Sequence, residues 1–257
     1  MGLEEITPNE VLYGSLSLIL VIISIIVGLK ILSKYFEYEK PTFITVGISW
    51  IFITSAWWVS AFSFVVLALF SYRFTPFWYL FIENAFSPIA IIFWIYSYTR
   101  LVLKEDNILR DIIFWVYFII CVLFEIALIT MLNINTELIG TGIEEGIFSS
   151  QLTTFAIGFQ IFGLLTFVIS GFSFSWQSIT SADLKITWKG RFLFAAFLSF
   201  TIGSILEALF ILDPISLILV RILLISANLE FYFGFFLPDN LSEFLIEKEK
   251  QLRWNKS

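Results

Sequence analysis

Seven apolar stretches, each long enough to cross a bilayer, limit the folds open to this chain. A helix rises about 1.5 Å per residue, so about 20 apolar residues cover a hydrocarbon core of about 30 Å. Hydrophobic residues make up 59% of the 257 residues, more than a soluble fold of this length can bury. We therefore expect an all-α, polytopic membrane bundle. The predicted transmembrane helices cover residues 11–32, 43–70, 77–101, 112–132, 152–175, 192–212 and 215–237.

Prolines mark where several of these helices begin, end or bend. Thr75-Pro76 and Asp213-Pro214 are typical of a cap followed by a first turn, where the missing N–H of proline costs nothing. Pro238 follows the last span and ends it. Pro88 lies inside the third span, so we expect a kink there, with neighbouring groups satisfying the freed carbonyl.

The basic residues predict the orientation. Of the fifteen Lys and Arg residues, all but Arg73 and Arg221 lie in alternate gaps, on one side of the membrane. Because basic loops stay in the cytoplasm, we expect an outside N-terminus and a cytoplasmic C-terminus in the plasma membrane. The basic residues on that side are Lys30, Lys34 and Lys40; Arg100, Lys104 and Arg110; Lys185, Lys189 and Arg191; and Lys248, Lys250, Arg253 and Lys256.

Residue types that are missing exclude several activities. The chain has no His, which excludes His-ligated haem, His-based zinc sites and serine–histidine catalysis. The last span has no Lys for a retinal Schiff base, and we expect no metal and no cofactor. Cys121 is the single cysteine, so it forms no intramolecular disulfide and is expected to be a buried small hydrophobe. A net charge of -6 argues against nucleic acid as a partner.

Ionisable side chains at membrane depth carry the remaining chemical information, because charge is costly there and marks a pocket, a pathway or a buried pair. The six such residues are Glu83, Glu125, Glu207, Asp213, Arg221 and Glu230. Asp213 is explained as a solvated cap. Counting along helices of alternating direction places four of the others at about 5 to 10 Å below the outer edge of the hydrocarbon core. The predicted outer-half ligand-binding set is Glu83, Asn84, Glu125, Gln160, Glu207 and Arg221.

Helical periodicity predicts which way these side chains point. Ser199, Gly203 and Glu207 recur at intervals of four, and small residues mark faces where helices approach closely. Glu207 is therefore expected to point into the bundle. Arg221 and Asn228, seven apart, share a face of the last span.

Glu230 and Asn228 are polar residues of the inner half. At about 100° per residue, the nine positions from Arg221 to Glu230 put these two residues on opposite sides of the last span. Either this helix has protein on both sides, or Glu230 pairs with hydroxyls from another span.

The outer polar set has two interpretations. In one, Arg221 binds an anionic ligand, or the carboxylates bind a cation or a proton. In the other, Arg221 is neutralised by Glu207 or Glu83 in a buried pair that fixes helix packing, and the remaining acids are neutral. A proton relay would need carboxyls in series across the bilayer, and the inner half offers only Glu230.

Tryptophans and the tail complete the predicted layout. Trp57-Trp58 falls in the middle of a span, where it fills the core or lines a ligand cavity, and Trp50 is expected at a membrane interface. Residues 1–238 form the predicted transmembrane domain and residues 239–257 a cytoplasmic tail. Leu241, Phe244 and Leu245 give this tail the stripe of an amphipathic helix.

The layout resembles the seven-helix sensor regions of prokaryotic signalling proteins. The likeness rests on seven spans, short loops, an outer polar cluster and an amphipathic helix after Phe235-Phe236-Leu237-Pro238. The chain is also similar in plan to heptahelical receptors, with Tyr98-Thr99-Arg100 closing the third span. Only Arg100 of that triplet matches the receptor pattern, and the paired receptor cysteines are absent. The resemblance therefore implies a topology and assigns a role to no residue.

These observations favour a non-enzymatic sensor or receptor that binds a ligand in the outer half. It would signal through its tail to a separate cytoplasmic protein, as a monomer or a homo-oligomer in the lipid bilayer. The alternatives are a small-solute transporter built as three plus one plus three helices and a packing subunit of a larger membrane assembly. Comparing spans one to three with five to seven gives no convincing repeat.

Overall fold

The computed structural model describes residues 7–141, 150–210 and 212–254, the last three as backbone only. In this part of the chain, seven helical segments are long and apolar enough to cross a membrane, so the chain is a multi-pass membrane protein. The seven predicted spans are confirmed. The segments are Pro8–Tyr38, Pro41–Phe70, Pro76–Val102, Leu109–Ile134, Thr154–Ile179, Leu184–Leu209 and Pro214–Phe235.

Three of these spans are divided into shorter elements, and a further helix follows the last one. The elements in chain order are α1 (Pro8–Ser33), α2 (Tyr35–Tyr38), α3 (Pro41–Ile53), the 3-10 turn η2 (Ser55–Trp57), α4 (Trp58–Phe70), α5 (Pro76–Asn84), α6 (Ser87–Val102), α7 (Leu109–Ile134), η3 (Thr136–Leu138), β1 (Gly140–Thr141), β2 (Gln151–Leu152), α8 (Thr154–Ile179), α9 (Leu184–Leu209), α10 (Pro214–Phe235) and α11 (Asp239–Trp254).

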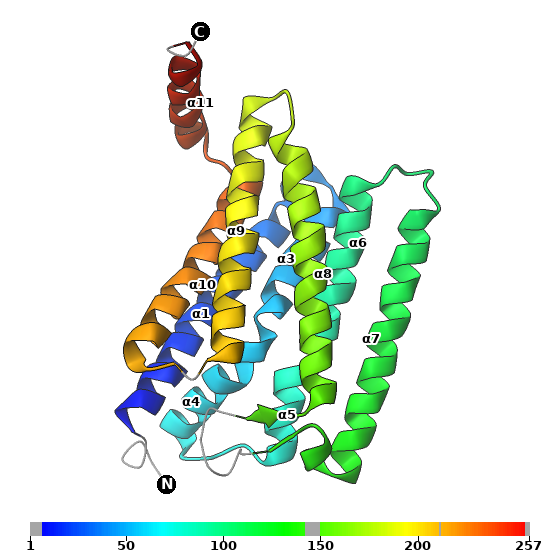
Figure 1. Ribbon diagram of the computed structural model, residues 1–257, viewed down its shortest axis with the longest axis vertical. Helices are drawn as coiled ribbons and strands as arrows, with labels where there is room; N and C mark the ends of the chain where they lie inside the picture. Colours follow the sequence, from blue (N-terminus) through cyan, green and yellow to red (C-terminus); the bar gives the residue numbers. More distant parts are fainter. Residues whose placement is uncertain (1–6, 142–149, 211, 255–257) are drawn as a thin grey trace.

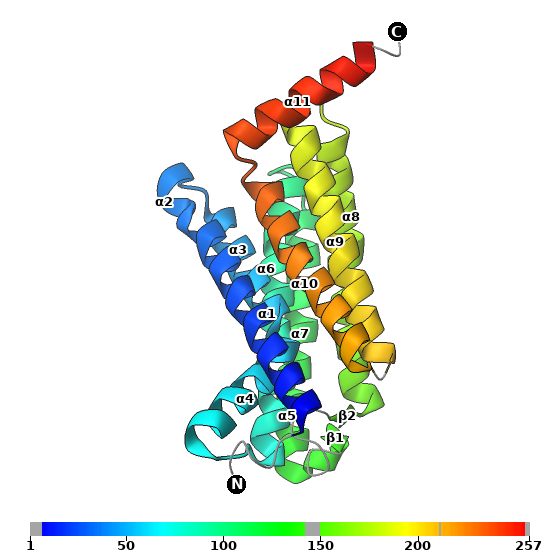
Figure 2. The same cartoon turned by 90° about the vertical axis from the view of Figure 1, so that its left-hand side faces the viewer.

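The spans form one elongated bundle (Figure 1). Helix α9 packs against α8 and α10, α1 packs against α3, α4 and α10, and α7 lies at one edge beside α6. Figure 2 shows α11 crossing one end of the bundle, which we call the α11 end, while α1 begins at the opposite, N-terminal end. The tail that follows Pro238 is helical over Asp239–Trp254, and residues 255–257 of the predicted tail lie outside the described residues.

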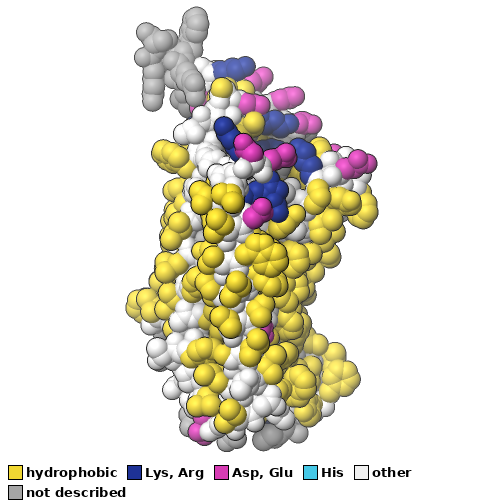
Figure 3. Space-filling view, turned by 90° about the vertical axis from the view of Figure 1, so that its right-hand side faces the viewer, with side chains coloured by type: hydrophobic (Ala, Val, Ile, Leu, Met, Phe, Trp, Pro, Cys, Tyr) yellow, Lys and Arg dark blue, Asp and Glu magenta, His cyan; other side chains and the backbone are white. Residues whose placement is uncertain are grey.

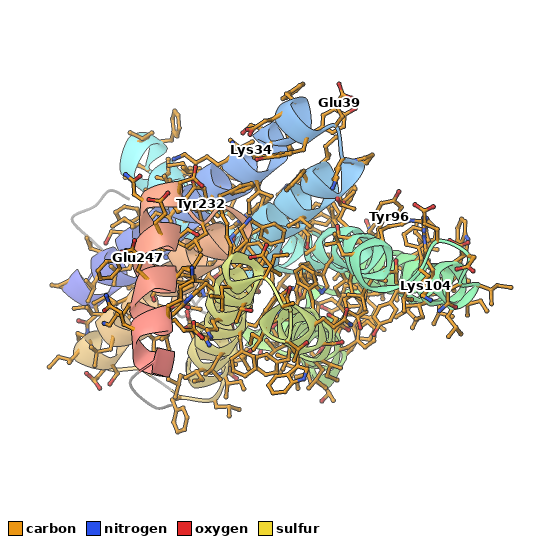
Figure 4. All side chains as sticks on the ribbon, turned by 90° about the horizontal axis from the view of Figure 1, so that it is seen from above. Lys34, Glu39, Tyr96, Lys104, Tyr232 and Glu247 are labelled. Carbon is orange, nitrogen blue, oxygen red and sulfur yellow. The ribbon has the colours of Figure 1, made fainter. Side chains whose placement is uncertain are left out.

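The surface has the distribution that a bilayer requires. Apolar side chains cover the long side of the bundle in Figure 3, and Lys and Arg gather with acidic residues near α11. Figure 4, drawn from the α11 end, shows charged residues spread across this end from three parts of the chain: Lys34 and Glu39 on either side of α2, Lys104 after α6, and Glu247 on α11. The basic gaps identified in the sequence therefore meet at one end of the molecule.

Two neighbouring spans are interrupted. The expected kink at Pro88 is confirmed, because α5 ends at Asn84 and α6 begins at Ser87. The carbonyl of Asn84, freed by the proline, accepts a hydrogen bond from the Ser87 hydroxyl at 3.0 Å. The second interruption was not predicted: α3 ends at Ile53 and η2 follows, with the Thr54 hydroxyl donating to the carbonyl of Ile51 at 2.9 Å.

Aromatic rings dominate the interior. Trp50, which we expected at an interface, is 1% exposed, so that expectation is wrong. Its ring stacks on Phe231 of α10 with centroids 3.5 Å apart. Cys121 is fully buried and free, as its apolar position predicts. Asp213 caps α10 by accepting from the backbone N–H of Ile215 at 2.9 Å, so its prediction as a helix cap is also confirmed.

Candidate functional site

The central feature of the site is an ion pair between the two helices that meet at the N-terminal end of the bundle. Helix α9 ends at Leu209, which puts Glu207 in its last turn, and α10 begins at Pro214, which puts Arg221 two turns along. The turn between these helices brings the two side chains together. Arg221 Nη2 donates to Glu207 Oε1 at 2.7 Å, and the Arg221 side chain is fully buried while that of Glu207 is 13% exposed.

Two further elements complete the surroundings of this pair. The Tyr13 hydroxyl of α1 donates to Glu207 Oε1 at 2.9 Å, and Trp57 Nε1 of η2 donates to Glu207 Oε2 at 2.9 Å. Ser17 lies one turn after Tyr13 on α1, and its hydroxyl accepts from Arg221 Nη2 at 3.1 Å. Four elements of the fold therefore converge on one carboxylate and one guanidinium.

Aromatic rings border the guanidinium as well. Its central carbon lies 5.1 Å from the ring centroid of Tyr13 and 5.7 Å from that of Trp57, within the range of cation–π attraction. Among the described residues, the Nε and Nη1 atoms of Arg221 are buried and have no hydrogen-bond partner. A fully buried arginine thus retains donors directed at no protein acceptor, and such donors are costly unless something accepts from them.

Glu83 binds elsewhere. Both of its carboxylate oxygens accept from the Ser150 hydroxyl, each at 2.8 Å, which connects α5 to the residue before β2. The alternative pairing of Arg221 with Glu83 is therefore not the one observed.

The other members of the predicted outer set are also separate from the ion pair. Gln160 Nε2 of α8 donates to Asn84 Oδ1 of α5 at 3.4 Å, a long contact, and Asn84 Nδ2 donates to the carbonyl of Leu80 at 2.9 Å. Glu125 is half-buried on α7. The structure gives Glu125 no hydrogen bond and no ion pair among the described residues. The predicted set is thus divided into the Glu207–Arg221 pair and three local arrangements.

The inner-half polar residues, Asn228 and Glu230, lie in the half of α10 nearer to α11. Asn228 is buried on the same side as Arg221, and its Oδ1 accepts from Trp50 Nε1 at 2.8 Å. Glu230 accepts from the hydroxyl of Ser226 at 2.6 Å. This hydroxyl belongs to the same helix and not to another span, which was one of the two alternatives for Glu230. The second oxygen of Glu230 is buried and has no partner among the described residues.

Sequence reasoning missed the three side chains that complete the ion-pair site: Tyr13, Ser17 and Trp57. Tyr13 and Ser17 are polar residues one turn apart on one face of a largely apolar first span, and this spacing is the signal in the sequence that could identify them. Trp57 had been considered only as a filler of the core or a wall of a cavity. Its hydrogen bond to Glu207 comes from the 3-10 turn η2, which interrupts a span that the sequence predicts as one unbroken helix.

A groove between α7 and α8, away from the ion pair, is lined by apolar residues. It has a volume of about 370 Å³ and is lined by side chains such as Phe124, Phe159 and Ala127 together with Gly158. It offers no group for acid–base chemistry or ion binding.

Neither a search for metal-ligand clusters nor a comparison with known proteins identifies a function for this site. Within the described ranges, no three Cys, Asp, Glu or His side chains are grouped as a protein metal site requires. Comparison of the chain with protein-family models, with curated proteins and with solved structures gives no match.

Proposed function

We propose that this protein is a non-enzymatic seven-helix membrane receptor whose ligand acts on the Glu207–Arg221 pair and whose output is the position of α11. The observation that carries the proposal is that α9 is joined to α10 and to its continuation, α11, at both ends of the bundle. At the N-terminal end the joint is the buried ion pair at 2.7 Å. At the α11 end the joint consists of two ion pairs between α9 and α11.

The joint at the α11 end is well defined. Lys185 Nζ contacts Asp239 Oδ1 at 2.7 Å. Arg191 makes a two-pronged contact with Glu249, at 2.8 Å and 3.2 Å, the geometry in which arginine binds carboxylate most specifically. Pro238 separates α11 from α10, so α11 moves as a unit whose attachment depends on α9.

Close packing between α9 and α10 supports the transfer of a shift along them. A Cβ added to Gly203 of α9 would lie 2.7 Å from Leu224 Cδ2, and one added to Gly234 of α10 would lie 2.4 Å from Leu193 Cγ. Two helices in such contact have few alternative arrangements. A displacement at the ion pair is then expected to move both helices together.

In this proposal the ion pair faces the outside half of the plasma membrane and α11 lies in the cytoplasm. The support is the concentration of basic residues at the α11 end, since basic loops are retained in the cytoplasm. A separate cytoplasmic protein would then bind α11, whose Phe244 is 60% exposed.

Coupling can be tested without knowing the ligand. In a Cys121→Ala background, spin labels at Phe36→Cys of α2 and Phe244→Cys of α11 report the distance across the α11 end, because both positions are exposed. We expect Glu207→Gln, which removes the ion-pair charge at the far end of α9, to shift or broaden this distance distribution in lipid nanodiscs. Tyr13→Phe, which removes one hydrogen bond to the same carboxylate, should give a smaller shift.

Glu83→Gln is the matched control. It makes the same chemical change in a span that is not joined to α11, so the distribution should remain that of the parent. If Glu207→Gln and Tyr13→Phe both leave the distribution unchanged while the proteins stay folded, the proposed coupling is wrong.

A solute transporter is the second candidate, and the paired interruptions favour it. Transporters place substrate sites at discontinuous helices, and here η2 and the break between α5 and α6 interrupt two neighbouring spans. However, α9 and α10, the spans that a second repeat would align with them, are uninterrupted. Solute flux into liposomes that depends on Arg221 would favour this candidate over the receptor.

A further inference from the structure

The ion-pair site has more hydrogen-bond donors than acceptors. Both oxygens of Glu207 already accept, from Tyr13, Trp57 and Arg221. By contrast, Arg221 Nε and Nη1 have no partner among the described residues, although the side chain is fully buried. A ligand that satisfies these groups must accept hydrogen bonds.

Charge decides which kind of acceptor fits. The Glu207 carboxylate and the Arg221 guanidinium balance each other, and within the described ranges no further cation is paired with them. An anionic ligand would therefore add a net negative charge to a buried site, whose cost exceeds that of a neutral acceptor. A neutral carbonyl oxygen can accept from a guanidinium N–H and leave the Glu207–Arg221 pair intact.

The residues around the two donor atoms of Arg221 indicate which kind of body the ligand has. The Tyr13 and Trp57 rings lie beside the guanidinium, and Phe200 meets the Trp57 ring edge-on with centroids 6.0 Å apart. Trp57 belongs to a short 3-10 turn rather than to a continuous helix, and non-helical backbone at membrane depth is found where it lines a cavity or is buried in protein. The surroundings of the free donors are therefore aromatic and apolar.

We propose that the site takes a neutral, carbonyl-bearing small molecule with an aromatic or apolar body, whose carbonyl oxygen accepts from Arg221 Nε or Nη1. This inference rests on the proposed receptor function, because it names the ligand class of the same site. Such a ligand can reach the site from the lipid phase as well as from water, since it carries no charge.

Benzophenone is a direct probe, because it is a neutral aromatic ketone that crosslinks to nearby C–H bonds under ultraviolet light. With the protein in nanodiscs, peptide mass spectrometry should place the crosslinks on the segments around Tyr13, Trp57 and Arg221. Arg221→Lys keeps the positive charge and removes the planar donors, and we expect it to lower labelling about tenfold, the loss of roughly one hydrogen bond to a charged group.

The anionic analogue 4-benzoylbenzoate provides the decisive comparison, since it has the same photochemistry and one negative charge. Stronger labelling of the site by the anion would overturn the neutral-ligand inference. It would also be overturned if Arg221→Lys, shown to be folded by its thermal unfolding, labelled as well as the parent, or if the crosslinks lay in the groove between α7 and α8. If benzophenone labels the site but leaves the Phe36–Phe244 distance unchanged, the ligand class stands and the receptor proposal fails.

Discussion

The α9–α10 pair and α7 differ in the surroundings they give to acids for which the sequence predicts a similar depth. Glu207 of α9 accepts from side chains of α1, η2 and α10, whereas Glu125 of α7 has no hydrogen bond or ion pair among the described residues. The helices differ in the same sense: 39% of the most apolar stretch of α10 is buried inside the bundle and only 17% of that of α7. Helix α7 therefore has more of its surface free of other helices than α10 does.

This contrast shows that depth alone does not make a site. A carboxylate at membrane depth becomes part of a network only where a second and a third helix approach closely enough to supply donors. Around Glu207 that approach is allowed by small residues such as Gly203, while the side of α7 beside α8 opens into an apolar groove. Packing, rather than the position of the charge in the span, separates the candidate site from an isolated acid.

The largest expected effect comes from removing the cation. Arg221→Ala should destabilise the protein by about 3 to 5 kcal/mol, because it leaves the Glu207 carboxylate buried without its charge partner. Unfolding in mixed micelles with increasing dodecyl sulfate measures this loss. The double variant Arg221→Met with Glu207→Leu removes both charges, so it should be markedly more stable than the single variant. Equal loss in both would mean that packing around the arginine stem, rather than the unpaired charge, dominates.

Removing the acids one at a time sharpens the comparison between the two regions. Glu207→Gln should cost about 1.5 to 3 kcal/mol, because a charged hydrogen-bonded partner of Arg221 becomes neutral. Glu125→Gln should change the unfolding free energy by no more than about 0.5 kcal/mol, since no partner is lost. The same micelle titration measures both variants. A cost at Glu125 as large as that at Glu207 would show that α7 has a partner in the membrane, such as another copy of the chain.

Two glycine substitutions test the packing contrast directly. A Cβ at Gly234 would lie 2.4 Å from Leu193 Cγ, whereas nothing lies within 4 Å of one at Gly158. Gly234→Ala should therefore destabilise by about 1 to 3 kcal/mol through overpacking, and Gly158→Ala should stabilise α8 by about 0.5 to 1 kcal/mol. Thermal unfolding midpoints in one detergent compare them. Destabilisation by Gly158→Ala would mean that the open space beside α8 is filled in the membrane.

The sequence predicts the architecture well because the requirement for about 20 apolar residues per span is local. The cap at Asp213 and the break at Pro88 are equally local and were found. The partners of Arg221 depend instead on how helices rotate against one another, which no single span specifies. The turn at Ser55–Trp57 contains no proline or glycine from which the sequence could predict it. This turn contains Trp57, whose indole N–H donates to Glu207.

The smallest expected effect is at the joint between α9 and α11, where the ion pairs are more exposed. The hydrogen bond from Lys185, together with its positive charge, holds the pKa of Asp239 below its ordinary value of 3.8. Because the pKa is lowered in the folded state, the contact contributes fully to the attachment of α11 above the ordinary pKa of 3.8. This contribution is lost as the pH falls through the lower pKa of the folded protein.

The attachment of α11 through Asp239 should thus be constant from pH 8 to 5 and weaken only below about pH 4, the ordinary range of the carboxyl. Spin-label distances between positions 36 and 244, recorded from pH 7 to 3 in the parent and in Asp239→Asn, measure this. The variant should show the weakened attachment at every pH, so the difference between the two proteins should disappear at the acid end. A difference that instead changes between pH 5 and 8 would assign the attachment to another titrating group.

In either protein the shift in the distance between positions 36 and 244 should be smaller than that caused by Glu249→Gln. The carboxylate of Glu249 is 12% exposed against 82% for Asp239, and water screens an exposed ion pair more strongly.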